Sequence, residues 1–239
     1  MFRRASFTAF SLPLMLLGCS NSDPQHPDAS RGDLGLCSAA CPLCCAPDGQ
    51  PACGAGVYPC GPYGTAAKGI AGNLQFIGYQ DPDEQCKANT AKQLDTSKPT
   101  QVSFKSFYLG DPGKSCKRKL LWVMVSAGWC TPCKTEVPKV QADYASGKLD
   151  DRVAVLNLVF ETETRGDPAT LKFLGDWVSA FKLTYPVGID PQFTMSPYFV
   201  KDQVPFNMLI DLADMRIFYQ QPSGSITAVY DQINAFFNP

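Results

Sequence analysis

The chain has 239 residues, of which 45% are hydrophobic and 18% are charged, enough for one sizeable globular core with a smaller appendage. Its 21 basic and 22 acidic residues give a net charge of -1, and without a positive excess we expect no nucleic-acid partner. A single histidine, His26, excludes a Ser/His/Asp triad in the core and leaves histidine-based metal sites almost without ligands. The eleven cysteines are unusual, and disulfides formed in an oxidising compartment explain them most simply.

Residues 1–18 have the pattern of an export signal. Two arginines precede an apolar stretch, Ala5 to Leu17, which is shorter than the roughly 20 residues of a membrane-spanning helix. The stretch ends in Leu-Leu-Gly-Cys19, which resembles the lipobox of bacterial lipoproteins, and the resemblance implies that the Cys19 thiol carries a lipid that holds the protein on a membrane. An ordinary cleaved signal peptide is the alternative. We expect a lipid-anchored protein on the extracytoplasmic side of the bacterial cell envelope, with the outer membrane favoured because Ser20 follows the cysteine.

The next two segments differ in composition. Residues 19–36 are rich in Asp, Pro, Ser and Gly, which predicts a disordered tether behind the lipidated cysteine. Residues 37–100 begin with six cysteines among Gly, Pro and Ala, and such a segment needs covalent staples because it cannot bury a core. A zinc site is the alternative, but exported thiols oxidise, so we expect structural disulfides and no metal. The pairing is open for these cysteines: Cys37, Cys41, Cys44, Cys45, Cys53 and Cys60.

Residues 101–239 show the pattern of an α/β domain. Residues 73–79 and 101–108 mix apolar and polar positions as edge strands do. Two nearly continuous apolar runs, at 120–125 and 153–160, are typical of central parallel strands buried on both faces. Helical spacing predicts a helix between these runs, a second over 171–181 and a third over 226–237, with a hairpin of 206–211 and 215–220 before the last helix. The order β-α-β-α-β-β-α resembles the thioredoxin fold, in which helices flank a central mixed sheet.

A C-x-x-C pair lies where the first buried strand gives way to the helix. The segment reads Trp129-Cys130-Thr131-Pro132-Cys133. The position of Cys130 at the helix N-terminus favours a thiolate, which is the attacking species. Cys133, one turn later and more buried, is suited to resolve a mixed disulfide with a substrate. In this place of a βαβ pattern the pair predicts redox chemistry rather than half a zinc site.

Two stretches resemble TlpA/ResA-type thiol-disulfide oxidoreductases of the thioredoxin superfamily, namely WCTPCKTEVP at 129–138 and VPFNMLID at 204–211. The likeness covers about residues 101–237. It implies that Pro205 is cis and faces the cysteine pair, and that Val204 offers backbone groups to a substrate strand. It also implies substrate contacts by the residues that surround the two cysteines: Trp129, Thr131 and Pro132.

The candidate acid-base residues of this chain differ from those of thioredoxins proper. Met124 stands where those proteins keep a buried aspartate, whereas Glu136 matches the glutamate of the ResA type. Glu161 and Glu163 follow the second buried strand at the same edge of the sheet and are rival candidates. The alternative for Glu136 is a solvated residue of the first helical turn, favoured by the helix dipole.

Cys86 and Cys116 are left after these assignments, and we predict that they form a disulfide. Closing a loop of about 30 residues would contribute roughly 3 to 4 kcal/mol. The basic residues that follow, Lys117 to Lys119, lie at the end of the strand opposite the motif, and we expect a solvated charge cluster.

The sequence therefore predicts a membrane-tethered thiol-disulfide oxidoreductase that uses its cysteine pair in place of a cofactor. Its partners would be protein thiols and disulfides of the envelope and an upstream redox protein. Peroxiredoxin chemistry is disfavoured because Ala127 stands where that family has a threonine. The alternative function is a cystine-rich surface or binding lipoprotein with a thioredoxin-like scaffold.

Overall fold

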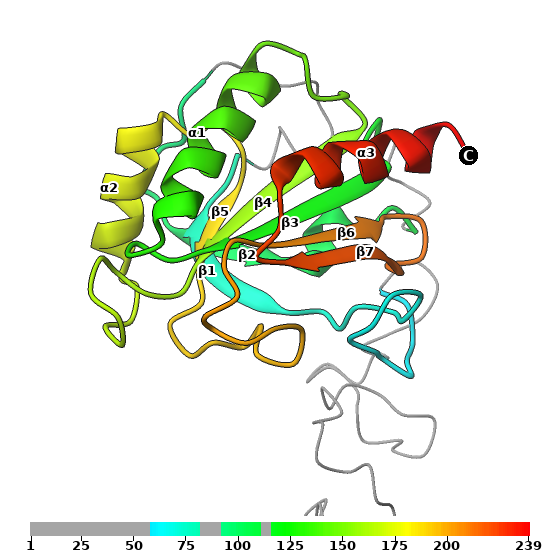
Figure 1. The fold of residues 1–239 in the computed structure, drawn as a ribbon, viewed down its shortest axis with the longest axis horizontal. Helices are drawn as coiled ribbons and strands as arrows, with labels where there is room; N and C mark the ends of the chain where they lie inside the picture. Colours follow the sequence, from blue (N-terminus) through cyan, green and yellow to red (C-terminus); the bar gives the residue numbers. More distant parts are fainter. Residues whose placement is uncertain (1–57, 82–91, 111–115) are drawn as a thin grey trace, which may run out of the picture. The chain divides into compact units, whose positions relative to one another are not determined.

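A seven-stranded mixed sheet forms the centre of the described part of the chain (Figure 1). The computed structural model describes residues 58–81, 92–110 and 116–239. The strand order is β2-β1-β5-β4-β3-β6-β7. Strands β3, β4 and β5 run parallel, and β6 is antiparallel to β3. The strands are β1 (Gln75–Tyr79), β2 (Thr100–Ser103), β3 (Leu120–Ser126), β4 (Val153–Val159), β5 (Val187–Ile189), β6 (Phe206–Asp211) and β7 (Ile217–Pro222).

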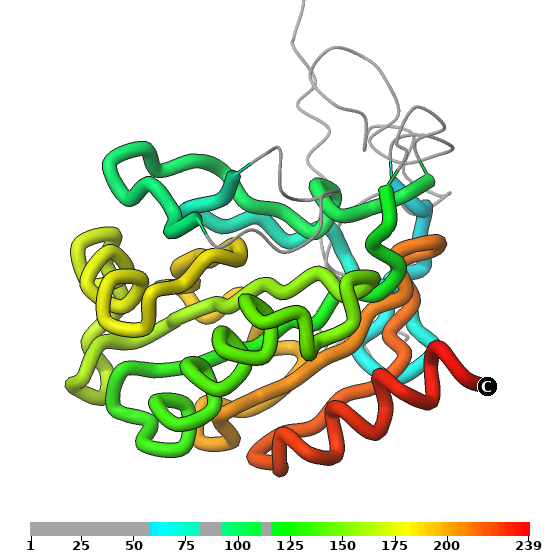
Figure 2. Tube along the Cα trace, turned by 90° about the horizontal axis from the view of Figure 1, so that it is seen from above, coloured from blue at the N-terminus to red at the C-terminus, as the bar shows by residue number. Residues whose placement is uncertain are grey.

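The three α-helices pack on one face of this sheet (Figure 1, Figure 2). They are α1 (Thr131–Ala145), α2 (Leu171–Phe181) and α3 (Ile226–Phe237). Alternation along β3 sends Leu120, Trp122 and Met124 to the helical face, where they meet apolar side chains of all three helices. None of the described helices has the length and apolar character needed to cross a membrane.

The opposite face of the sheet is covered by loops. The intervening residues of β3, Leu121 and Val123, pack there against the short 3-10 helix η1 (Phe104–Phe107) and the loop that precedes β6. Tyr58 and Ala71 complete this core; both are fully buried, and the Tyr58 hydroxyl donates to the Ala71 carbonyl at 2.8 Å.

The strand order and helix placement are those of a thioredoxin-like α/β fold, as the sequence predicts. The sheet nevertheless extends across the expected domain boundary at residue 100. Strand β1 pairs with both β2 and β5, and the residues before β1 cover one face of the sheet. The later part of the segment expected to be a cystine-rich extension therefore contributes to the main core.

Two local features differ from the sequence-based expectations. Strand β5 lies between α2 and the hairpin and was missed, because a three-residue strand is too short to show a period. The expected solvated cluster is wrong for Arg118, which is 2% exposed. Its guanidinium donates to the carbonyls of Asp151 and Val153 and to the Tyr144 hydroxyl, at 2.8, 2.6 and 3.0 Å. A buried cation is tolerated here because these oxygens accept three of its hydrogen bonds.

Candidate redox site

A disulfide joins Cys130 and Cys133 at the start of α1, with a Cα–Cα distance of 5.2 Å. Strand β3 ends at Ser126, and Cys130 is the N-cap of the helix. The backbone N–H of Cys133 donates to the Cys130 sulfur at 3.1 Å. Both cysteines are buried, at 2% and 0% exposure. This N–H group and the helix dipole would stabilise a Cys130 thiolate in the reduced protein.

The peptide bond between Val204 and Pro205 is cis. Pro205 immediately precedes β6, whose first residue, Phe206, pairs with Val125 of β3. The proline therefore lies at the end of the sheet where β3 leads into the redox motif. Val204 is buried in the same apolar cluster as the two cysteines. The structure thus brings together the two stretches in which the sequence resemblance was found.

The remaining motif residues surround the disulfide. Thr131 and Pro132 are exposed in the first turn of α1, and Trp129 is partly buried. The indole N–H of Trp129 donates to the Glu161 carboxylate at 2.7 Å. Arg165 lies over the face of the Trp129 ring, 3.6 Å from its centroid.

Glu136 is buried on α1, one turn beyond Cys133. The alternative of a solvated helix residue is therefore wrong. The Asn207 side-chain amide donates to Glu136 at 2.9 Å, and the Trp122 indole N–H donates to the Asn207 oxygen at 2.7 Å. Because an indole N–H can only donate, it fixes the orientation in which Asn207 presents its own N–H to the carboxyl group. Burial raises the pKa of Glu136 to about 7, and the Asn207 hydrogen bond opposes this shift.

The rival carboxylates have different surroundings. Glu161 is buried and also accepts a hydrogen bond from Lys201 at 2.9 Å. Burial raises the pKa of Glu161, but the hydrogen bonds from Lys201 and Trp129 outweigh that effect and hold it below its usual value. Glu163 is exposed. Of the three candidates, Glu136 alone lies one helical turn from a redox cysteine, and burial raises its pKa to about 7.

Sequence reasoning missed several residues around the site. Asn207 and Lys201 act on the two glutamates, and Arg165 covers Trp129 and forms an ion pair with Asp202 at 2.5 Å. Asn207 stands in one of the quoted stretches, but only its polar character inside an apolar strand hinted at a partner. Nothing in the local sequence indicated Lys201 or Arg165.

Several predicted cysteine assignments lie outside the described residues. Cys116 is partly buried, but Cys86 is outside the described ranges, so their disulfide stays a prediction. Cys60 is disulfide-bonded. In the described ranges no group of three or more His, Cys, Asp or Glu side chains is placed to hold a metal ion. The remaining cysteines expected to carry lipid or form structural disulfides also lie outside the described ranges: Cys19, Cys37, Cys41, Cys44, Cys45 and Cys53.

A scan of protein-family models finds no match to this sequence, and a search of curated proteins finds none either. Solved structures show similarity. StoA from Bacillus subtilis is 21% identical, with 56% of this chain and 87% of StoA covered and a TM-score of 0.40. The thioredoxin domain of a thiol-disulfide oxidoreductase from Bacteroides vulgatus is 16% identical. The match covers 72% of this chain and 99% of that domain, with a TM-score of 0.48. The exposed lipoprotein thioredoxin Etrx1 from Streptococcus pneumoniae is 18% identical, covering 68% and 97%, with a TM-score of 0.42.

The assignment of the fold rests on the structure of this chain itself. The sheet carries its strands in the order found above, the Cys130–Cys133 disulfide caps α1, and a cis peptide precedes Pro205 at the same end of the sheet. Together these features identify the described part of the chain as a thioredoxin-like domain.

Proposed function

We propose that the protein is a thiol-disulfide oxidoreductase that exchanges disulfides with proteins of the bacterial cell envelope. One observation carries the proposal: the Cys130–Cys133 disulfide lies at the N-terminus of α1, at the sheet end that also holds the cis bond before Pro205. The cysteine pair itself carries two electrons, so the reaction needs no bound cofactor. The binding-lipoprotein alternative offers no reason for a disulfide at a helix N-terminus.

The reaction begins with the reduced pair. The Cys130 thiolate attacks one sulfur of a substrate disulfide, forms a mixed disulfide and releases the other substrate sulfur as a thiolate. The Cys133 thiolate then attacks the Cys130 sulfur, which closes the Cys130–Cys133 disulfide and releases the second substrate thiolate. Two electrons pass from the pair to the substrate, and an upstream dithiol restores the reduced pair. The same steps in reverse would oxidise a substrate dithiol.

Glu136 is proposed to accept the proton that the Cys133 thiol loses before it attacks. The Cys133 thiol must lose a proton before its sulfur can attack, and a carboxylate with a pKa of about 7 can accept that proton near neutral pH. The side chain is one helical turn from Cys133, a spacing that places two residues on the same face of a helix. Trp129, Thr131 and Pro132 adjoin the cysteines in the chain, and Val204 lies in the same apolar cluster as both cysteines. All four are proposed to contact the substrate.

Trapping of the mixed disulfide tests the proposal. In a Cys133→Ser variant the resolving thiol is missing, so the protein should accumulate in covalent conjugates joined through Cys130. A Cys130→Ser variant should form few or none. Non-reducing gels of envelope fractions separate the conjugates, and mass spectrometry maps the joined cysteine. Conjugates through Cys133 would reverse the roles, and their absence from both variants would favour a binding protein.

The lipid anchor is a separate part of the proposal. It rests on the lipobox-like sequence that ends at Cys19. A Cys19→Ala variant should move from the membrane fraction to the soluble fraction of the envelope, while the wild type stays with the membrane. An unchanged distribution would remove the anchor from the proposal without affecting the redox chemistry.

A further inference from the structure

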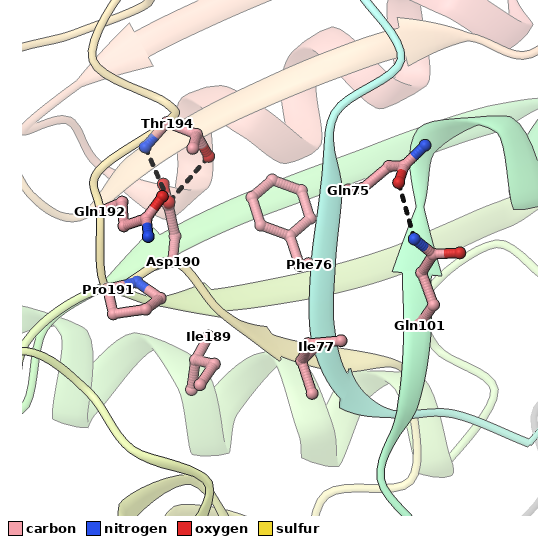
Figure 3. A pocket seen from close by; sticks show the side chains of 9 residues that line it. All are labelled: Gln75, Phe76, Ile77, Gln101, Ile189, Asp190, Pro191, Gln192 and Thr194. Carbon is pink, nitrogen blue, oxygen red and sulfur yellow. Dashed lines mark hydrogen bonds between the residues drawn. The ribbon is translucent and has the colours of Figure 1, made fainter.

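A pocket of about 310 Å³ opens between β1 and the loop that follows β5 (Figure 3). Strand β5 pairs with β1 only from Ile77 to Tyr79, whereas β1 continues through Phe76 and Gln75, which pair with β2. Within the described residues, the other side of Phe76 and Gln75 therefore has no strand beside it. The pocket occupies the place that β5 would fill if it continued past Ile189.

Asp190 makes the chain turn away from β1 at this point. Its carboxylate accepts hydrogen bonds from the backbone N–H and hydroxyl of Thr194, each at 2.7 Å, and from the backbone N–H of Met195 at 2.9 Å. These bonds, two of which are drawn in Figure 3, use the carboxylate inside the loop, and Asp190 is only 2% exposed. The pocket therefore presents no accessible charge of its own.

The walls of the pocket are apolar and its rim carries neutral amides. Phe76, Ile77, Ile189 and Pro191 supply the apolar surface. Ile77 is 47% exposed, which is unusual for a large apolar side chain of this domain. At the rim, the Gln101 amide donates to the Gln75 side-chain oxygen at 2.6 Å, and Figure 3 shows these two side chains facing one another. Such a surface suits an uncharged side chain carried by a polypeptide, whose amide groups can exchange hydrogen bonds with glutamine.

The pocket lies at the same edge of the sheet as the redox pair. Ile189 is in register with Val159, and Val159 with Ser126, the last residue of β3 before the motif. Neighbouring strands are about 4.8 Å apart, so the open side of β1 lies roughly 10 to 14 Å across the sheet from the end of β3 at Ser126. An extended polypeptide covers this distance with about three to five residues.

Contacts between aromatic side chains link the redox motif to the loop that lines the pocket. Trp129 packs edge-on against Phe160, with ring centroids 6.3 Å apart, and Phe160 contacts Phe193 at 5.1 Å. Phe193 belongs to the loop that lines the pocket, and both Trp129 and Phe193 are partly exposed. Phe160 itself is buried, so these contacts join the redox motif and the loop that lines the pocket through one aromatic cluster.

We propose that this pocket is a second subsite for the substrate polypeptide. An extended segment, about three to five residues from the substrate cysteine, lies along the open side of β1 and places an uncharged apolar side chain against Ile77 and its cross-strand neighbour Ile189. This inference rests on the proposed redox function. It adds a preference for substrates with an apolar side chain near the cysteine, which the cysteine pair alone does not give.

Short peptides with one cysteine, held as a mixed disulfide with thionitrobenzoate, test the subsite. The reduced protein is mixed with peptides that carry either leucine or aspartate about three to five residues from the cysteine. Release of the coloured thiol gives the rate constant. The wild type should react about tenfold faster with the leucine peptides, since a buried leucine side chain contributes at least that factor.

An Ile77→Asp variant should lose the preference for leucine. Phe218→Asp is the matched control, because Phe218 is also an exposed apolar residue, 39% exposed, but lies on β7 at the far side of the sheet. Pro191→Asp places a charge on the opposite wall of the pocket and gives the answer if Ile77→Asp does not fold. Retention of the leucine preference in the folded pocket variants would overturn the proposal, as would its absence in the wild type.

A small aromatic disulfide without any peptide separates this inference from the redox function. The folded wild type and pocket variants should reduce it at equal rates, and Cys130→Ser should be inert. Equal rates for wild type and Cys130→Ser would instead reject the redox function itself.

Discussion

Glu136→Gln removes a charge that the folded protein must bury above neutral pH. In the folded state the pKa of Glu136 is about 7, against an ordinary value of 4.5. Between these two values the folded protein binds more protons than the unfolded chain, so the free energy of unfolding falls as the pH rises. The total loss is roughly 3 kcal/mol, from 1.36 kcal/mol per pKa unit. Glutamine does not ionise, and its oxygen can still accept the Asn207 hydrogen bond.

The variant should therefore match the wild type near pH 4 and exceed its free energy of unfolding by roughly 3 kcal/mol near pH 8. Urea unfolding of the disulfide-bonded protein measures both values, and in that form the two active cysteines do not titrate. Glu163→Gln is the control, because Glu163 is exposed at the same edge of the sheet and should follow the wild type. A difference between Glu136→Gln and wild type that is the same at both pH values would refute the reasoning.

Three further substitutions test the structure, the first two by urea unfolding and the third by hydrogen exchange. Asn207→Leu leaves the buried Trp122 N–H without an acceptor and should lower the free energy of unfolding by about 2 to 4 kcal/mol. The free energy should also fall more steeply with pH, because the hydrogen bond that lowers the Glu136 pKa is lost. An unchanged stability would contradict the hydrogen bonds described for Asn207. Arg118→Ala removes the donor from two buried oxygens and one partly buried oxygen and should cost about 3 to 5 kcal/mol, whereas replacing a solvated arginine would cost almost nothing. Gly78→Ala puts a Cβ 1.9 Å from a β5 carbonyl oxygen and should expose β1 amides to hydrogen exchange, while Gly175→Ala, with its nearest contact at 3.8 Å, should not.

Local sequence determined the elements that hold the redox pair. The continuous apolar runs predicted β3 and β4, and the helical spacing between them predicted α1. A cysteine at the junction of such a strand and helix lies at the helix N-terminus whatever surrounds it, so the place of Cys130 followed from the chain alone. These features depend on residues only a few positions apart, which is why they could be read without a structure.

Tertiary structure decided the properties that depend on distant partners. Glu136 and Glu161 are both acidic residues near the motif, but one meets Asn207, 71 residues away, and the other meets Lys201, 40 residues away. Burial raises the pKa of the first despite the opposing Asn207 hydrogen bond, whereas the hydrogen bonds from a cation and an indole outweigh burial and lower the pKa of the second. The burial of Arg118 likewise depends on partners 26 to 35 residues away along the chain. Local sequence determines which backbone groups and dipoles a residue meets, but burial and long-range hydrogen bonds determine the charge it carries, and these exist only once the chain has folded.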